Sequence, residues 1–206
     1  MKILAFTDTH GNMKPLEHLQ KVIQQEQRKK LPIDVAVCCG DFTIFGQKMK
    51  SQLKKMNDLG IPVVVIHGNH ESASLVRKES ALYKNITMVD RTMCRFGNTV
   101  FMGYGGGGFA LTDTTFLRWG KEQFKKIKKD DKVVLLFHGP PHGTNLDLVG
   151  GGHCGNKDYT FFIREHHKQL YLVLAGHIHE CNGQMDKIKD VVVANPGPNG
   201  RLFEIK

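Results

Sequence analysis

The sequence has few cysteines, and those it has do not form recognisable pairs. Five occur among 206 residues: Cys38, Cys39, Cys94, Cys154 and Cys181. The number is odd and no C-x-x-C pair is present, so the pattern indicates neither a disulfide framework nor a cysteine-based zinc site. We therefore expect free thiols, buried in the core or placed in loops.

Long hydrophobic runs are also lacking. No apolar segment approaches the ~20 residues that a membrane-spanning helix needs. Residues 1–6 form too short an apolar region for a signal peptide, and they lead directly into polar Thr7-Asp8-Thr9-His10. Repeats, low-complexity segments and linkers are absent too. We expect a cytoplasmic protein without membrane association, folded as a single domain over residues 1–206.

Acidic residues are outnumbered. Asp and Glu total 20 against 29 Lys and Arg, which gives a net charge of +9. Such an excess favours an anionic partner. Much of it lies in residues 28–30 and 121–132, where solvated helix faces and helix ends explain it. Nucleic acid stays open as a partner but is not the favoured one, and the sequence does not indicate an oligomeric state.

Short apolar runs alternate with helical patterns in the first third of the chain. Strands are predicted at 2–7, 33–39 and 62–66, and helices at 15–28 and 47–59. This order predicts an α/β fold with a parallel sheet and right-handed crossovers. Ligands of such sheets bind beyond the carboxyl ends of the strands.

The rest of the chain mixes shorter strands with helices. The predicted helices are near 72–83, 116–129 and 157–168, and the predicted strands are 86–89, 92–96, 99–103, 133–137, 171–175, 190–194 and 201–205. The glycine-rich segment 103–108 formally matches G-x-G-x-x-G, but it does not open directly into a helix. We therefore reject a dinucleotide site and expect a loop there. A second long loop is expected at 139–155.

Polar residues follow the predicted strands at the point where each one ends. They are Asp8, His10, Asp41, Asn69, His70, His138, His177 and His179. Mixed Asp, His and Asn ligands without thiolate suit Mn²⁺, Fe, Zn²⁺, Ni²⁺ or Co²⁺. The set exceeds what one ion needs, so two divalent metal ions are the economical interpretation, with Mn²⁺ favoured. Two metals ~3.5–4 Å apart are the usual means of in-line displacement at phosphorus.

Five sequence blocks together resemble the calcineurin-like metallophosphoesterases, and most closely their compact prokaryotic predicted phosphoesterases. The blocks are Asp8-Thr9-His10, Gly40-Asp41, Gly68-Asn69-His70-Glu71, His138 and Gly176-His177-Ile178-His179. The resemblance implies two stacked mixed β-sheets flanked by helices, a four-layer αββα sandwich, with a dinuclear metal site at the strand ends.

The resemblance also implies a role for each matching residue. The first metal is expected on Asp8, His10 and His179, the second on Asn69, His138 and His177, with Asp41 bridging them. A metal-bridging hydroxide would attack phosphorus. His70, outside the metal shell, would contact the substrate and protonate the leaving group. Asn69 would also face the substrate.

The expected activity is hydrolysis of small phosphate esters. Phosphodiesters are favoured over monoesters because no large cap insertion separates the blocks, so the site should be open. A nuclease at the same site and a non-catalytic interaction scaffold are the alternatives, and the intact His70 argues against the scaffold.

Four further residues have expected positions near this site. His142 and His153, in the 139–155 loop, are candidates for substrate contact, although solvated loop histidines explain them equally well. Glu71 is expected to cap the helix that follows it. Asn195 is expected to brace the Gly176–His179 loop.

Overall fold

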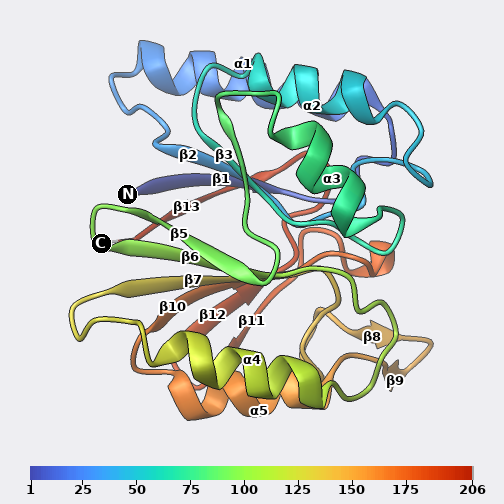
Figure 1. Cartoon of the computed structure of the whole chain (residues 1–206), viewed down its shortest axis with the longest axis vertical. Helices are drawn as coiled ribbons and strands as arrows, with labels where there is room; N and C mark the ends of the chain where they lie inside the picture. Colours follow the sequence, from blue (N-terminus) through green and yellow to red (C-terminus); the bar gives the residue numbers. More distant parts are fainter. Residues whose placement is uncertain (206) are drawn as a thin grey trace.

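The computed structural model describes residues 1–205, which form two stacked sheets between two layers of helices (Figure 1). The helices are α1 (Met13–Arg28), α2 (Met49–Asn57), α3 (Ala73–Ser80), α4 (Thr114–Phe124), α5 (Lys157–His166) and the short 3-10 helix η1 (His179–Cys181). The strands are β1 (Lys2–Phe6), β2 (Val35–Cys38), β3 (Val63–Val65), β4 (Ile86–Met88), β5 (Thr92–Phe96), β6 (Thr99–Tyr104), β7 (Lys132–Phe137), β8 (Leu148–Val149), β9 (Gly152–His153), β10 (Leu170–Leu174), β11 (Met185–Ile188), β12 (Val191–Ala194) and β13 (Arg201–Glu204).

Both large sheets are mixed. The first has the order β13-β1-β2-β3-β4 and the second the order β11-β12-β10-β7-β6-β5. Strands β1 to β4 run parallel, and β13 joins β1 antiparallel. In the second sheet the parallel core β12-β10-β7-β6 has antiparallel edge strands, β11 and β5. The predicted two-sheet sandwich is therefore confirmed.

The near-continuous apolar runs follow from burial of both faces of each sheet. In β1, Leu4 and Phe6 pack against the helices while Ile3 and Ala5 face the other sheet. Strand β7 repeats this alternation. Three apolar layers result: one under α1–α3, one between the sheets and one under α4–α5. Figure 1 shows the helices and sheets that enclose them. This packing holds the carboxyl ends of β1, β2, β3, β7 and β10 at one edge.

Several element boundaries differ from the predictions. The predicted loop 139–155 contains the β8–β9 hairpin, and β11 was not predicted at all. Helix α2 starts at Met49, after a bridge between Ile44 and Gln47 and a positive φ at Lys48. Helix α4 ends at Phe124 instead of residue 129, because the N–H groups of Lys126 and Ile127 bond carbonyls three residues back, those of Gln123 and Phe124.

Within the described residues, no helix is long and apolar enough to cross a membrane.

Candidate metal centre

The loops after the parallel strands carry strained polar residues. Four of them have positive φ: Asp8 (54°), His10 (45°), Asp41 (48°) and His177 (71°). Residues other than glycine incur a free-energy cost in this conformation, and it persists only where surrounding contacts enforce it. Here the enforcing contacts include hydrogen bonds from the Asp8 backbone N–H to the Gly40 carbonyl (3.1 Å) and from the His10 N–H to the Asp41 carbonyl (3.0 Å). The first two loops thus fix each other.

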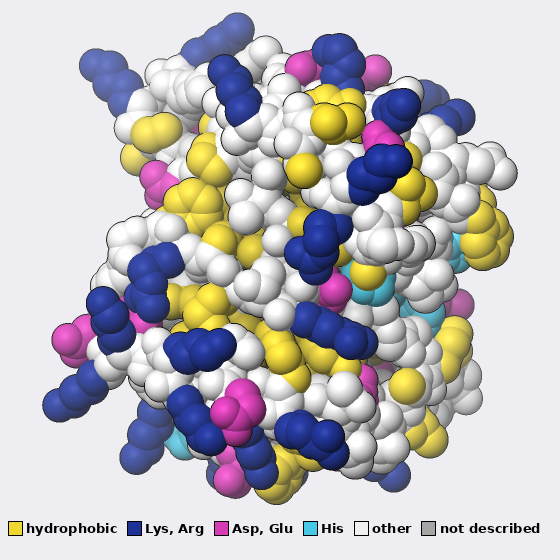
Figure 2. All heavy atoms as spheres, viewed as in Figure 1, with side chains coloured by type: hydrophobic (Ala, Val, Ile, Leu, Met, Phe, Trp, Pro, Cys, Tyr) yellow, Lys and Arg dark blue, Asp and Glu magenta, His cyan; other side chains and the backbone are white. Residues whose placement is uncertain are grey.

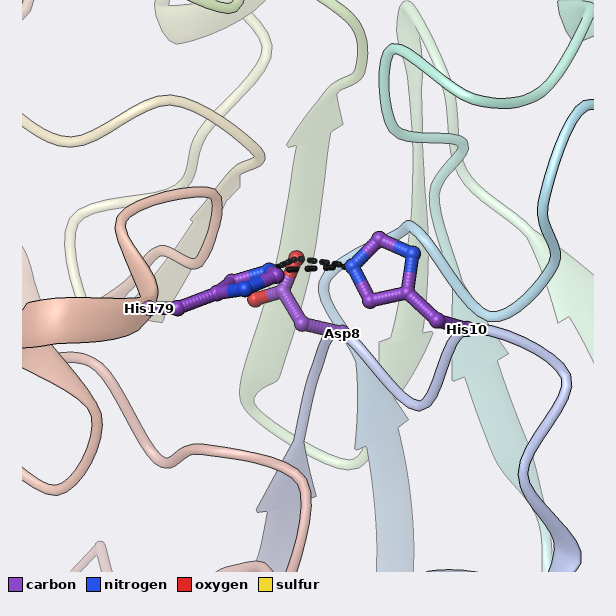
Figure 3. A group of neighbouring side chains, drawn as sticks. All are labelled: Asp8, His10 and His179. Atoms are coloured by element: carbon purple, nitrogen blue, oxygen red, sulfur yellow. Dashed lines mark hydrogen bonds and ion pairs between the residues drawn. The ribbon is translucent and has the colours of Figure 1, made fainter.

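One group of side chains, which we call the outer group, consists of Asp8, His10 and His179 (Figure 3). The Nε2 atoms of His10 and His179 lie 2.9 Å apart. They lie 3.9 and 3.8 Å, respectively, from Asp8 Oδ1. Two imidazole nitrogens at this separation need a proton or a cation between them. The outer group joins loops that follow one strand from each sheet.

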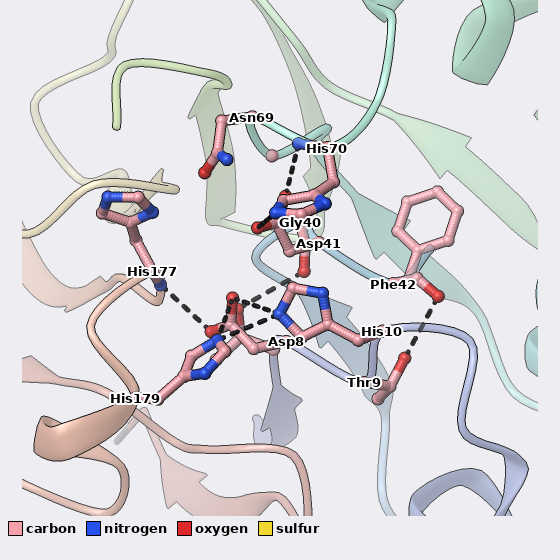
Figure 4. A network of polar contacts seen from close by, with 12 residues as sticks. Asp8, Thr9, His10, Gly40, Asp41, Phe42, Asn69, His70, His177 and His179 are labelled. Carbon is pink, nitrogen blue, oxygen red and sulfur yellow. Dashed lines mark hydrogen bonds and ion pairs between the residues drawn. The ribbon is translucent and has the colours of Figure 1, made fainter. Parts of the chain in front are cut away.

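A second group, the inner group, consists of Asp41, Asn69, His138 and His177. Asn69 Oδ1 lies 2.9 Å from His138 Nε2, and Asp41 Oδ2 lies 3.3 Å from the same nitrogen. The rings of His138 and His177 have centroids 5.2 Å apart. Figure 4 shows Asn69 and His177 pointing toward each other beside Asp41.

The environment of His138 calls for positive charge. Its Nδ1 lies 2.9 Å from the Cys39 carbonyl oxygen and must donate a proton there. In a neutral ring, Nε2 would then present a lone pair to the oxygens of Asp41 and Asn69, which are also acceptors. Burial alone would lower the pKa of His138, but the nearby carboxylates outweigh burial and raise it. A proton on Nε2, or a metal ion between Nε2 and these oxygens, would resolve the conflict between the acceptors.

Two buried atoms in the groups have no hydrogen-bond partner in residues 1–205: Asp8 Oδ1 and His177 Nε2. Buried polar atoms normally have partners, so each exception needs an explanation. Burial, reinforced by His138, lowers the pKa of His177 to about 4, so this ring is neutral at pH 7 and can offer a lone pair. Nitrogen and oxygen donors without thiolate are what divalent cations of the Mn²⁺ to Zn²⁺ series accept. The residues present therefore fit divalent metal ions.

Asp41 connects the two groups. It belongs with His138 and His177 on one side and with His10 and His70 on the other. Burial opposes ionisation of Asp41, but its hydrogen bonds with the His138 ring and with the backbone N–H of His70 lower its pKa overall. A carboxylate held ionised between two ligand groups can be shared by two cations.

Comparison with known proteins identifies the family. The family model described as Calcineurin-like phosphoesterase matches residues 1–181. This chain belongs to the calcineurin-like phosphoesterases. A 3',5'-cyclic-nucleotide phosphodiesterase of Nostoc sp. (strain PCC 7120) is 23% identical over 196 aligned residues, which cover 87% of this chain and 72% of that protein.

Solved structures support the fold of the family. A protein of Thermus thermophilus superposes with a TM-score of 0.76 at 17% identity, covering 96% of this chain and 90% of the other. A dimetal phosphatase from Danio rerio gives a TM-score of 0.64 at 12% identity, covering 94% of this chain and 86% of that one. The phosphopantetheinyl hydrolase of Mycobacterium tuberculosis gives 0.66 at 10% identity, with coverages of 95% and 88%.

His70 lies beside Asp41 on the exposed side of this calcineurin-like site. Its Nε2 is 3.9 Å from Asp41 Oδ2, and its backbone N–H donates to Asp41 Oδ1 at 2.9 Å. Its ring packs edge to face against His10, with centroids 5.0 Å apart. His70 is therefore close to both groups, and its side chain is 25% exposed.

Gly68 permits a close approach rather than a sharp turn. Its φ lies outside the left-handed region, but a Cβ there would overlap Asp41 Oδ1. Gly176 is similar, since its Cβ would overlap the Thr7 hydroxyl and lie 2.5 Å from Asp8 Oδ2. Both glycines let a loop sit directly on a carboxylate of the site.

Glu71 does not cap α3, contrary to the sequence-based expectation. Its buried carboxylate turns back and accepts four hydrogen bonds: from the N–H groups of Gly68 (2.8 Å), Asp41 (2.9 Å) and Thr43 (2.8 Å), and from the Thr43 hydroxyl (2.8 Å). Burial raises the pKa of Glu71 despite these donors. The side chain ties the loop after β2 to the loop after β3. Donors such as the Asp41 N–H lie 30 residues away along the chain, so residue types alone could not reveal them.

Asn195 contacts the Gly176–His179 loop as expected. Its buried amide donates to the Ile178 carbonyl at 3.1 Å and accepts from the Gly197 N–H at 3.0 Å. His67 donates a hydrogen bond from Nδ1 to the Gly68 carbonyl oxygen (2.8 Å), and its Nε2 lies 3.6 Å from Asp90 Oδ1. The His67 backbone carbonyl accepts the Gly106 N–H at 3.1 Å, which supports the glycine-rich 103–108 segment, a loop from Gly105 onward.

His142 lies apart from both groups. Its ring is 5.6 Å from that of His153, and it lines a surface pocket of about 240 Å³ with Lys157 and Arg164. Neither histidine belongs to the three clusters of potential metal ligands found in residues 1–205. Their contact with substrate remains a prediction.

Proposed function

We propose that this phosphoesterase hydrolyses phosphodiesters with two divalent metal ions. Asp8, His10 and His179 would hold one ion, and Asn69, His138 and His177 the other, with Asp41 between them. The observation that carries the proposal is the convergence of these seven side chains, from five loops, with an ionised Asp41 at the centre. Mn²⁺ is the favoured ion because carboxylate and amide oxygens supplement the imidazoles.

When bound, two such cations supply charge neutralisation at the phosphoryl oxygens and a water of lowered pKa. The protein contributes geometry. Loops that the sheets and Glu71 hold in place pre-organise the ligands, so little reorganisation accompanies catalysis. Asn69 ligates without adding negative charge, which limits repulsion of an anionic ester.

His70 would donate a proton to the leaving alkoxide. An imidazole can perform this transfer near neutral pH, and a positioned acid typically contributes 10²–10⁴-fold in rate. The ring stands next to the proposed bridging ligand, since its Nε2 lies 3.9 Å from Asp41 Oδ2. The backbone bond from His70 to Asp41 Oδ1 fixes where the ring stands.

Two observations favour diesters over monoesters. The five blocks are joined without a large inserted cap, so both ester groups of a diester can enter. The Nostoc relative bears the name of a cyclic-nucleotide phosphodiesterase. A nuclease at the same site is the second candidate, on the strength of the +9 net charge; salt-sensitive DNA or RNA binding would favour it.

The test is a panel of metals and substrates. Protein stripped of metal and reloaded with Mn²⁺, Ni²⁺, Co²⁺ or Zn²⁺ is assayed with bis(p-nitrophenyl) phosphate and with p-nitrophenyl phosphate. We expect activity to need added metal, with kcat/KM for the diester at least about tenfold higher. The Asp41→Asn variant serves as the control for contaminating enzymes. Inactivity with all four metals would refute the enzymatic proposal, and a monoester preference would refute the diester assignment.

A further inference from the structure

Two phenylalanines stand exposed at the entrance to the metal centre. The exposed fraction is 77% for Phe45 and 66% for Phe109. Solvating large apolar rings is unfavourable, and such exposure near a site often marks a binding surface. Figure 2 shows hydrophobic side chains above and below the histidines at the right-hand edge of the molecule.

Both rings contact histidines of the site. The Phe45 ring lies 4.6 Å from the His70 ring at an interplanar angle of 33°. The Phe109 ring lies 4.4 Å from the His177 ring in an edge-to-face arrangement at 65°. Phe45 therefore borders the proposed general acid, His70, and Phe109 borders the proposed metal ligand His177.

The chain fixes the Phe45 loop in its position. Phe45 has a positive φ of 49°, which an aromatic residue adopts only under constraint. The constraint comes from Thr43, whose hydroxyl accepts the Gly46 N–H at 3.1 Å and donates to Glu71. The same Glu71 carboxylate orders the metal loops, so Phe45 and the metal centre share one support.

The Phe109 loop is anchored separately. The Asn156 amide donates to the Ala110 carbonyl at 2.8 Å, and the Lys157 N–H donates to the Leu111 carbonyl at 2.8 Å. These bonds attach the loop to the start of α5. Phe109 is thus held in place from the second sheet's side of the site, whereas Phe45 follows β2 of the first sheet.

We infer that Phe45 and Phe109 form an aromatic rim that binds a planar ring of the substrate, so that the substrate class is a phosphodiester of a nucleoside. This inference rests on the proposed function. With the phosphate between the outer and inner groups, an organic substituent can extend past either ring. Base–aromatic stacking tolerates any base, and its loss typically costs about fivefold to a hundredfold in affinity. A nucleobase is the planar group that phosphodiesters most commonly carry.

The first test measures binding without turnover. Calorimetry with Mn²⁺-loaded protein compares adenosine 5'-monophosphate with ribose 5-phosphate, which share the phosphate and the sugar and differ in the base. We expect the mononucleotide to bind at least about fivefold more tightly. Equal affinities of the unmodified protein for the two ligands would refute the proposed aromatic rim.

The second test assigns the preference to the two rings. Phe45→Ala and Phe109→Ala should each reduce the affinity ratio severalfold, and Phe45→Leu, which keeps apolar volume but lacks a π face, should also reduce it. The matched control is Tyr171→Ala. Tyr171 is an exposed aromatic residue at the start of β10, opposite the carboxyl ends that form the site, and its replacement should leave the ratio unchanged.

Each remaining outcome decides one question. If both phenylalanine variants keep the mononucleotide preference, the base binds elsewhere and the rim is refuted. If the unmodified protein shows no preference and the variants change from dimer to monomer in sedimentation, the rings cover a second copy of the chain and the rim is refuted. If the ratio falls as expected while no diester is hydrolysed with any metal, the rim stands and the proposed catalysis fails.

Discussion

The inner and outer groups differ in how much of their arrangement the fold itself supplies. His138 of the inner group is fully buried at 0% side-chain exposure, and a bond to the Cys39 carbonyl orients its ring. His179 of the outer group is 55% exposed, and its ring nitrogen meets the opposing Nε2 of His10. The core therefore orders the central imidazole of the inner group, whereas the two imidazoles of the outer group depend on a proton or cation between them.

This contrast predicts that the two sites bind metal with unequal affinity. A ligand group that is already ordered loses little conformational entropy when it binds an ion. We thus expect the inner site to bind more tightly and to exchange more slowly. Substitutions in the shared ligand, in each group and in the loops that support them can test this difference.

Asp41→Asn should have the largest effect, because Asp41 is the residue that both groups share. The amide can still accept the His70 N–H, but it loses the negative charge between the cations. We expect loss of two-metal occupancy and a fall in kcat of at least about 10³-fold, which corresponds to several kcal/mol of transition-state stabilisation. Elemental analysis and diester turnover measure both effects. Full occupancy by two ions would refute the bridging assignment.

His70→Ala should separate catalysis from metal binding. Its ring touches both groups but would ligate neither ion. We expect a fall in kcat of about 10²-fold, typical of a lost general acid, with metal content unchanged. His70→Asn controls for lost polarity without restoring proton transfer. If metal is lost in proportion to activity, His70 is a ligand instead.

His138→Ala and His179→Ala form a matched pair that tests the contrast directly. In metal-free protein, His138→Ala should lower the free energy of unfolding by about 2 kcal/mol or more, because it empties a buried position and leaves the Cys39 carbonyl unpaired. His179→Ala should change it by less than about 0.5 kcal/mol, as exposed substitutions usually do. Thermal unfolding in chelator gives both values. Equal destabilisation would show that the two groups do not differ in their dependence on the core.

The sequence could place the candidate ligands beyond the strand ends because each follows an apolar run closely. Asp8 and Asp41 come within a few residues of a strand buried on both faces, and the parallel arrangement then brings the strand ends together. Their division into two metal sites came from the family resemblance alone. Residue spacing cannot show that His10 faces His179 from the other sheet.

What the sequence could not predict depends on backbone groups and on very short elements. Glu71 was misassigned because its four donors lie largely in another loop, and any carboxylate before a helix suggests a cap. The β8–β9 hairpin has two residues in each strand, too few for a periodic pattern. The exposure of Phe45 and Phe109 could not be predicted, since the sequence does not distinguish an exposed phenylalanine from a buried one.

Asp147→Asn should weaken the outer group selectively. The buried Asp147 carboxylate accepts the N–H groups of Gly143 (3.0 Å), Thr144 (2.9 Å) and Gly155 (2.9 Å) and contacts His153 Nδ1 (2.8 Å). It holds together the 139–155 loop, whose Leu148 carbonyl accepts the Sγ–H of Cys181 in η1 at 3.6 Å. Since η1 begins with His179, loosening this loop should disturb the outer group and leave the inner one intact.

The pH dependence of this variant has a definite sign. Burial opposes ionisation of Asp147, but the backbone donors outweigh it, so its pKa is lowered in the folded state. A lowered carboxylate pKa gives stability that is present above the unfolded value of ~3.9 and lost as pH falls through the folded value. Metal-free Asp147→Asn should therefore be less stable than the unmodified protein by about 1.5–3 kcal/mol at pH 7, and the difference should shrink below about pH 4. A difference that stays constant from about pH 7 to about pH 3 would mean that the charge of Asp147 does not hold this loop, and the outer group would then need another support.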